Sequence, residues 1–193
     1  MGNREALVEG AKACLLEKGY SRTTARDIAT AAGVSLAAIG YHFGSKEALL
    51  NEAMREALDQ WGVEVAQTMS VGSVNAGPQQ RFVRTWRQAI DSLSIPGVRA
   101  LWTTQFEVLS LGAQLPELLA DLSKLQGEAR EGVAHLFGGV DEDADPETVQ
   151  RVGTFFQALL LGVVALYLFD PDKAPTGEDL ATSIRLVADR LKN

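Results

Sequence analysis

Residues 23–46 (TTARDIATAAGVSLAAIGYHFGSK) constrain the fold of this chain more than any other stretch. Thr24 is placed to cap a short helix, with Asp27 three residues later in the position that completes a capping box. Ile28 continues the helix with an apolar side chain, and Gly33 supplies the left-handed conformation that ends a helix. The stretch therefore begins with a short helix that closes in a tight turn.

A second helix follows that turn directly. Ser35 is placed to cap a helix from Leu36 to about His42, and Ser45 is placed to cap a long amphipathic helix that begins at Lys46. Two short helices joined by a tight turn have the spacing of a helix-turn-helix, whose second helix lies in the major groove of DNA. The sequence therefore predicts a DNA-binding domain at the N-terminus.

The same residues carry a family resemblance. They are Thr24-x-x-Asp27-Ile28-Ala29, Ala32-Gly33-Val34-Ser35, Ile39-x-Tyr41-His42-Phe43 and Ser45-Lys46-Glu47-x-Leu49. This pattern resembles the DNA-binding domain of the tetracycline-repressor (TetR) family. The resemblance implies an all-α fold of about nine helices, with a helix-turn-helix domain at 1–46 and a C-terminal ligand-binding and dimerisation domain at 47–193.

The net charge of −7 divides unevenly along the chain. Residues 1–46 carry six basic and four acidic side chains (+2), and residues 47–193 carry twelve basic and twenty-one acidic side chains (−9). A basic tip on an acidic body is compatible with DNA binding, because only the docking face must meet phosphate. The acidic body should keep non-specific affinity for DNA low.

Several other chemistries are disfavoured by composition. Cys14 is the single cysteine and His42 and His135 are the only histidines, so we expect no disulfide, no metal site and no cofactor. The acidic run at 138–146 lacks the glycine and spaced glutamate of a calcium loop. Catalytic motifs are absent, so we expect no enzyme, and the absence of an apolar N-terminal segment predicts a cytoplasmic protein.

The N-terminal end of the second helix should read base edges, and neighbouring side chains should contact phosphates. The expected base contacts are Ser35, Leu36, Ala37 and Ala38, with Ser35 alternatively occupied as a cap. The alanines offer only methyl groups, so specificity should lean on Arg26 and on DNA shape. The expected phosphate contacts are Thr24, Tyr41, His42 and Lys46.

Gly40 departs from the family pattern, because many members carry an aromatic side chain there that touches the DNA backbone. Its absence removes a contact, for which Tyr41 could compensate, and it costs the helix up to about 1 kcal/mol. Gly40 and the two alanines leave one alternative open, a helical adaptor that binds protein partners instead of DNA.

Residues 47–193 read as amphipathic helices separated by turn-rich segments at 71–78, 95–97, 112–116 and 138–146. The candidates for a ligand pocket on these helices are Trp86, Trp102, Gln105, Phe106, Gln157 and Tyr167. Taken singly, each of these residue types is more often plain core than a ligand contact. Few charges occur among them, so we expect a small, largely apolar effector that shifts the protein off DNA, as in a repressor.

The segment 152–169 is the most apolar part of the chain. A membrane span is conceivable, but the run is at the short limit, and we expect a helix buried on nearly all sides in a protein without a membrane partner. With the last helix it should build a four-helix homodimer interface, which the resemblance favours over packing inside one subunit. The candidate interface residues are Phe156, Ala158, Leu160, Gly162, Val163, Ala165, Leu180, Ile184, Val187 and Leu191. Such a dimer would bind double-stranded DNA at a palindromic operator.

Overall fold

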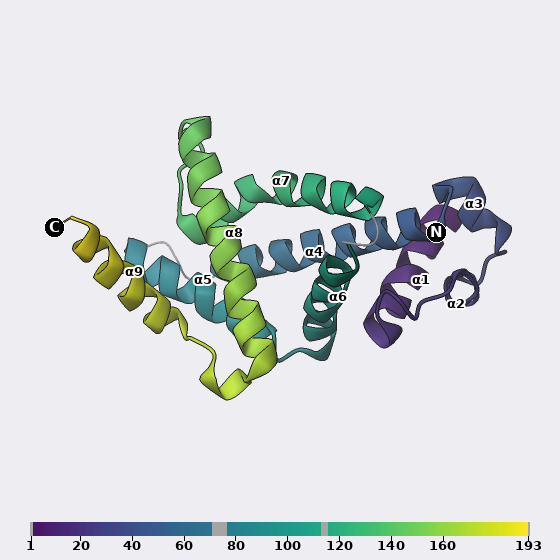
Figure 1. The fold of residues 1–193 in the computed structure, drawn as a ribbon, viewed down its shortest axis with the longest axis horizontal. Helices are drawn as coiled ribbons and strands as arrows, with labels where there is room; N and C mark the ends of the chain where they lie inside the picture. Colours follow the sequence, from purple (N-terminus) through teal and green to yellow (C-terminus); the bar gives the residue numbers. More distant parts are fainter. Residues whose placement is uncertain (1, 71–76, 113–115, 193) are drawn as a thin grey trace. The chain divides into compact units, whose positions relative to one another are not determined.

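The computed structural model describes residues 2–70, 77–112 and 116–192, and this part of the chain is helical without strands. This part contains nine α-helices, which are labelled in Figure 1, and one short 3₁₀-helix. They are α1 (Asn3–Lys18), α2 (Ala25–Ala32), α3 (Ala37–Phe43), α4 (Lys46–Ser70), α5 (Pro78–Ser92), α6 (Pro96–Gly112), α7 (Pro116–Gly138), α8 (Pro146–Phe169), η1 (Pro171–Lys173) and α9 (Gly177–Leu191). The predicted all-α fold is confirmed.

The chain divides into two compact units. Unit 1 comprises Met1–Gly62 and Pro96–Ser123, and unit 2 comprises Val63–Ile95 and Lys124–Asn193. Helices α4 and α7 each contribute to both units. The boundary that we expected at residue 46 separates DNA binding from ligand binding, whereas these two units are defined by packing. The expected functional boundary therefore stays a prediction.

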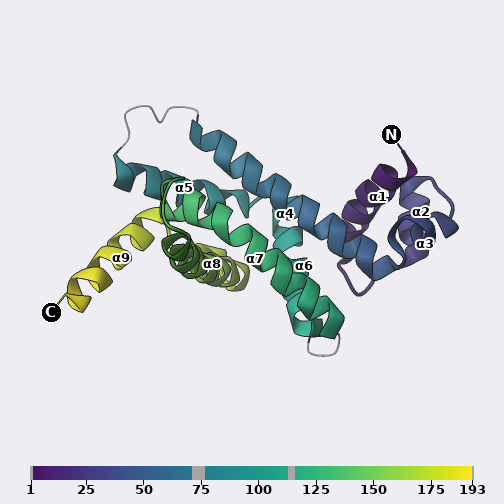
Figure 2. The ribbon, with the colours of Figure 1, turned by 90° about the horizontal axis from the view of Figure 1, so that it is seen from above.

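Unit 1 is organised around α1, which packs against α2, α3 and α6. Figures 1 and 2 both show α1, α2 and α3 gathered in one cluster. A Cβ atom at Gly10 would lie 2.9 Å from the backbone nitrogen of Ala32, so glycine is what lets α1 and α2 approach so closely. Ile28 and Leu50 are completely buried, and each contributes about 1.5–3 kcal/mol by leaving water.

Unit 2 packs α5 against α8 and α9. The ring of Trp86 on α5 lies 5.0 Å from that of Phe137 on α7 and 6.4 Å from that of Phe156 on α8, centroid to centroid. These aromatic contacts join three helices that are far apart in sequence. Gly177, at the start of α9, allows a close approach to α5, since its Cβ atom would lie 2.6 Å from the carbonyl oxygen of Val83.

Helix α8 differs from the helix expected at 152–169. It is long and apolar enough to cross a membrane by length and composition alone, and its most apolar 18-residue window has a mean hydropathy of 2.1. One face packs into unit 2 through Phe156 and Val163, whereas Phe155 and Phe169 on another face are 55% and 88% exposed. The expectation of burial on nearly all sides is therefore wrong.

Local details agree with the sequence at most helix ends. Helix α1 ends before Gly19, which has φ +77°, and Ser45 Oγ accepts the backbone N–H of Ala48 at 3.0 Å to cap α4. The second short helix begins one residue later than expected, at Ala37. The turns predicted at 71–78 and 112–116 lie largely outside the described residues.

Candidate nucleic-acid interface and effector site

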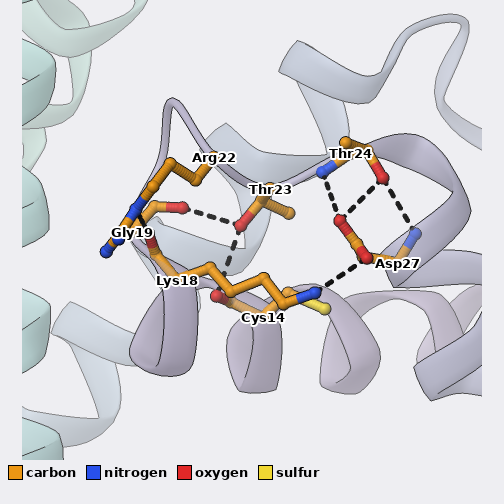
Figure 3. A network of polar contacts seen from close by, with 7 residues as sticks. All are labelled: Cys14, Lys18, Gly19, Arg22, Thr23, Thr24 and Asp27. Atoms are coloured by element: carbon orange, nitrogen blue, oxygen red, sulfur yellow. Dashed lines mark hydrogen bonds and ion pairs between the residues drawn. The ribbon is translucent and has the colours of Figure 1, made fainter.

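Figure 3 shows the polar network that begins α2. The Oγ1 atom of Thr24 accepts the backbone N–H of Asp27 at 3.1 Å, and the Asp27 carboxylate accepts the backbone N–H of Thr24 at 2.9 Å. Lys18 donates to the same carboxylate at 2.8 Å from the last turn of α1. These hydrogen bonds, from Lys18 first and Thr24 next, hold the pKa of Asp27 far below its ordinary value. The predicted capping box is confirmed.

Thr23 anchors the segment between α1 and α2. Its side chain is almost completely buried, and its hydroxyl lies 2.7 Å from the carbonyl oxygen of Gly19 and 3.2 Å from that of Cys14 (Figure 3). The Nζ atom of Lys46 donates to the carbonyl oxygen of Thr23 at 3.2 Å. The end of α1 and the start of α4 thus meet at one residue that the sequence did not single out, because its partners are backbone atoms.

The turn between α2 and α3 has the expected left-handed glycine. Gly33 has φ +67°, and the next residue, Val34, donates its N–H to the carbonyl of Ala29 at 3.1 Å, which closes the helix end. Ser35 does not cap α3: the residue before the helix is Leu36, and within the described residues no hydrogen bond of the Ser35 hydroxyl is recorded. The cap expected at Ser35 is wrong, and its hydroxyl stays available.

Helix α3 presents a free face to solvent. Ile39 turns into the core of unit 1, whereas Leu36 and Tyr41 are 51% and 86% exposed. Of the expected base-reading residues, Ser35, Leu36 and Ala37 are exposed and Ala38 is half-buried. Acidic side chains are absent from positions 33–46, so this face carries no charge that would repel phosphate.

The expected phosphate contacts differ in how free their polar groups are. Thr24 uses its hydroxyl and its N–H within the capping box. Lys46 lies 3.3 Å from the Glu47 carboxylate in addition to its bond with Thr23, and His42 is half-buried beside the Tyr41 ring. Tyr41 is 86% exposed, and Arg26 is also exposed, on the first turn of α2.

Helix α6 holds the turn before α2 through a residue that sequence reasoning missed. The two carboxylate oxygens of Glu107 accept the backbone N–H groups of Tyr20 and Ser21, each at 2.9 Å. Burial alone would raise the pKa of Glu107, but the hydrogen bonds from Ser21 and Tyr20 outweigh it and lower that pKa. A Cβ atom at Gly19 would lie 2.8 Å from the carboxylate, so this approach requires glycine.

Three of the expected pocket residues lie on the same helix in unit 1. Trp102 and Gln105 are 4% and 6% exposed, and Phe106 is half-buried. The indole Nε1 of Trp102 and the amide Oε1 of Gln105 are buried without a hydrogen-bond partner among the described residues. Trp102 packs edge-on against Trp61 of α4, with ring centroids 5.1 Å apart. A buried donor and a buried acceptor are therefore unsatisfied one helical turn apart.

The other three expected pocket residues lie in unit 2. Trp86 is completely buried, and its Nε1 also lacks a partner within the described part of the chain. Gln157 is already bonded, since its Nε2 donates to the Gln126 carbonyl at 2.9 Å and its Oε1 accepts from Arg130 at 3.4 Å. Tyr167 is half-buried. The six candidates are thus shared between two units, and Gln157 has least need of a ligand.

The expected interface residues fall into three groups by burial. Within unit 2 the structure buries Phe156, Leu160, Val163 and Leu180. A side chain that is buried inside one subunit has no surface to offer to a second subunit. The prediction that these four residues form the dimer interface is therefore wrong, because they belong to the core of unit 2. Ala165 and Ile184 are half-buried. The exposed members are Ala158, Gly162, Val187 and Leu191.

No group of three His, Cys, Asp or Glu side chains among the described residues could hold a metal ion.

Comparison with known proteins supports the assignment of the N-terminal helices to a DNA-binding domain. Residues 7–53 match the profile of the family described as "Bacterial regulatory proteins, tetR family". The HTH-type transcriptional repressor KstR2 of Rhodococcus jostii is 33% identical over 130 residues, which are 67% of this chain and 61% of that protein. The repressor AcnR of Corynebacterium efficiens is 27% identical over 143 residues, 71% of this chain and 76% of its own length.

Solved structures share the fold over nearly the whole chain. A transcriptional regulator from Rhodococcus sp. Rha1 has a TM-score of 0.60 at 21% identity, with 95% of this chain and 92% of that chain covered. The multidrug binding protein EbrR, solved with proflavin, has a TM-score of 0.64 at 21% identity, with 95% and 97% covered. At this level of identity the likeness concerns the fold.

A capped helix-turn-helix on an otherwise helical chain defines a helix-turn-helix regulatory protein. The matches to the family profile and to the repressors narrow that class further. The chain belongs to the tetR family of bacterial regulatory proteins. Its relatives are regulators and not enzymes, as the sequence led us to expect.

Proposed function

We propose that this chain is a cytoplasmic, DNA-binding transcriptional repressor that works as a homodimer and leaves its operator when a small effector binds. The observation that carries the proposal is the fixed helix-turn-helix, in which a capping box orients α2 and α3 keeps an exposed face free of acidic side chains. Repression is favoured because the relatives that match are repressors.

In this proposal α3 enters the major groove. Ser35, with its unoccupied hydroxyl, and the exposed Leu36 and Ala37 meet base edges, and Ala38 lies beside them. Arg26 adds specificity from α2, and Thr24, Tyr41, His42 and Lys46 face phosphates. Two copies spaced about 34–36 Å apart would read a palindrome on one side of the duplex.

The dimer would form through the exposed apolar faces of α8 and α9. Phe155, Ala158, Gly162, Leu166 and Phe169 recur every three or four residues of α8, so they share one face of that helix. The corresponding exposed residues of α9 include Val187 and Leu191, which are 57% and 82% exposed. Large apolar faces of this kind are typical of subunit interfaces, and burying them in a dimer also removes the need for a membrane around α8.

The effector would bind at α6. Trp102 offers an unpaired N–H and Gln105 an unpaired carbonyl oxygen, both neutral, so the ligand should be an uncharged, largely apolar molecule with one acceptor and one donor. Phe106 flanks them in sequence, and Trp86, Gln157 and Tyr167 stay candidates in unit 2. Glu107 follows on the same helix and holds the turn before α2, so a ligand that moves α6 would loosen the reading helices.

The test is fluorescence anisotropy with the duplex upstream of this gene and a shuffled duplex, over a salt series. We expect tighter binding to the upstream duplex. Lys46→Ala should weaken binding to both duplexes alike and reduce the salt slope by about 1, whereas Lys173→Ala, in η1, should change neither. Equal binding of the two duplexes by the unmodified protein would contradict sequence-specific DNA recognition and favour a protein adaptor.

Sedimentation tests the dimer separately. Leu166→Glu places a charge on the exposed face of α8 and should convert dimers to monomers. Leu16→Glu makes the same change at a half-exposed position of α1 and should leave the dimer intact. A dimer that survives Leu166→Glu would rule out this face.

A further inference from the structure

The turn between α1 and α2 forms a small anion site, and a side chain of the protein itself occupies it. The site consists of the backbone N–H groups of Tyr20 and Ser21, which are successive in the chain. The first donates to Oε2 of Glu107 and the second to Oε1, each at 2.9 Å. Successive N–H groups that converge on one place in this way are a recurrent binding site for anions.

The charge around the turn matches an ionised carboxylate. Burial alone would raise the pKa of Glu107, but the hydrogen bonds of the turn and the nearby charge of Arg22 lower it. The Nε atom of Arg22 donates to the carbonyl oxygen of Lys18 at 2.8 Å, which ties that side chain to the end of α1 (Figure 3). Glu107 is therefore an anion at neutral pH, and hydrogen bonds to an anion are about twice as strong as those to a neutral group.

The same face of α6 makes a second contact with α1. Thr104 lies three residues before Glu107, so the two side chains share one face of the helix. Thr104 is 3% exposed, and its hydroxyl donates to the carbonyl oxygen of Leu15 at 3.5 Å. One turn of α6 thus contacts a carbonyl near the end of α1 and the N–H groups of the turn that follows.

The position of this turn determines where the reading helices begin. Thr24, three residues after Ser21, caps α2, and Thr23 between them is buried and bonded to the end of α1. A shift of the turn is therefore passed directly to α2, and through the tight turn at Gly33 to α3. Side chains that bind a partner must be held within about 0.5 Å of their productive positions.

We propose that Glu107 is a positioning residue for DNA recognition: its carboxylate fills the anion site of the turn and so fixes the reading helices in the geometry that fits an operator. The inference rests on the DNA recognition proposed above and names a residue on which its specificity depends. Glu107 itself does not touch DNA. As a negative charge it opposes DNA binding, whereas as a positioning group it favours binding to the operator, so the two effects have opposite signs.

Fluorescence anisotropy with the upstream and the shuffled duplex separates these effects. Glu107→Gln removes the charge at similar shape and turns an amide toward the N–H groups. It should bind the upstream duplex at least tenfold more weakly and the shuffled duplex about as well as before. Glu17→Gln, at an exposed position in the last turn of α1, removes the same charge and should weaken binding to neither duplex. Binding of the upstream duplex by Glu107→Gln that equals or exceeds that of the unmodified protein would overturn the proposal.

Chemical rescue tests whether the carboxylate is the group that matters. Glu107→Ala empties the anion site, and about 100 mM formate should restore most of the affinity for the upstream duplex, whereas chloride at the same ionic strength should not. The unmodified protein in both salts corrects for the direct effect of salt on DNA binding. Circular dichroism establishes that the variants are folded, and Glu107→Gln decides alone if the alanine variant is not. A loss of affinity in folded Glu107→Ala that formate does not recover would assign the effect to lost packing and overturn the proposal.

Amide hydrogen exchange measures the same contact without DNA. In Glu107→Gln the amides of Tyr20 and Ser21 should exchange at least tenfold faster, whereas the Gly19 amide, which donates to the carbonyl of Leu15 at 3.0 Å, should be unchanged. Unchanged exchange at Tyr20 and Ser21 would overturn the proposal. Equal binding of the two duplexes by the unmodified protein is a different result, the failure of the proposed function, and it is seen before any variant is measured.

Discussion

The segment that begins the helix-turn-helix and the inner face of α6 differ in whether their polar groups are hydrogen-bonded. Between Thr23 and Asp27, buried or bridging donors find acceptors a few residues away. On α6, Trp102 Nε1 and Gln105 Oε1 are buried and have no partner among the described residues. Thr23 is as buried as these two residues, so burial alone does not explain the difference.

The comparison separates the scaffold of the helix-turn-helix from the proposed effector site on α6. A satisfied hydrogen bond contributes about 0.5–1.5 kcal/mol, whereas an orphaned buried group costs about 1–3 kcal/mol. The reading helices must keep one geometry, and local hydrogen bonds fix it. A pair of orphaned groups destabilises the free protein and is relieved when a ligand supplies the missing donor and acceptor. The following substitutions test this contrast from the largest expected effect to the smallest.

Thr23→Val should lower the free energy of unfolding by about 1–3 kcal/mol, because it removes a buried hydroxyl that bonds to the end of α1. Urea denaturation measures the change. Thr30→Val, at an exposed position of α2, is the matched control and should have a small effect. Equal effects at the two positions would show that the network around Thr23 does not hold the helices together.

Gln105→Met should act in the opposite direction and raise the free energy of unfolding by about 1 kcal/mol, since it removes an unsatisfied buried oxygen at similar volume. It should also weaken the response of DNA binding to effector. The control Gln80→Met, at an exposed position, should leave stability unchanged. Destabilisation by Gln105→Met would mean that the oxygen is satisfied in solution and would remove the contrast.

Gly40→Ala should raise the free energy of unfolding by about 0.5–1 kcal/mol, because a Cβ atom at this helical position meets nothing within 4 Å. Thermal unfolding measures it. Gly33→Ala is the opposite case, since φ +67° disfavours a side chain, and it should destabilise. A stabilising Gly33→Ala would show that the turn is free to relax.

The pH dependence of Asp27 should give the smallest effect. Its pKa is lowered in the folded chain, first by Lys18 and then by Thr24, so its stabilising contribution is complete above the ordinary carboxyl pKa of 3.8 and is lost as the pH falls through the folded value. The stability difference between the unmodified protein and Asp27→Asn should therefore be constant from about pH 7 to pH 5 and shrink below about pH 4. A difference that grows on acidification would contradict the assignment.

Local features of the helix-turn-helix were predictable. Thr24 and Asp27 lie three residues apart, and Gly33 needs no partner beyond its own turn, so short-range chemistry specifies both. Ser35 was misjudged because Ser45 and Ser35 look alike in sequence, and only the conformation of Leu36 distinguishes them. The hydrogen bond that the backbone N–H of Tyr20 donates to Glu107 joins residues 87 positions apart, a separation at which no sequence pattern gives a signal.

Helix α8 illustrates the same limit. Most of its residues are apolar and lie on every side of the helix, so hydrophobic periodicity could not say which face would turn inward. Phe156, Leu160 and Val163, which we expected at the dimer interface, became core, whereas the adjacent Phe155 is exposed. Successive residues differ by about 100° around a helix, which makes adjacent phenylalanines face different surroundings.

The sequence by itself determined the class of fold and the reading helices, because helix caps, turns and apolar spacing act over a few residues. Tertiary packing alone decided which polar groups were left without partners and which apolar face remained exposed. These properties depend on which surfaces the folded chain brings together, and those contacts join residues that are far apart in the sequence.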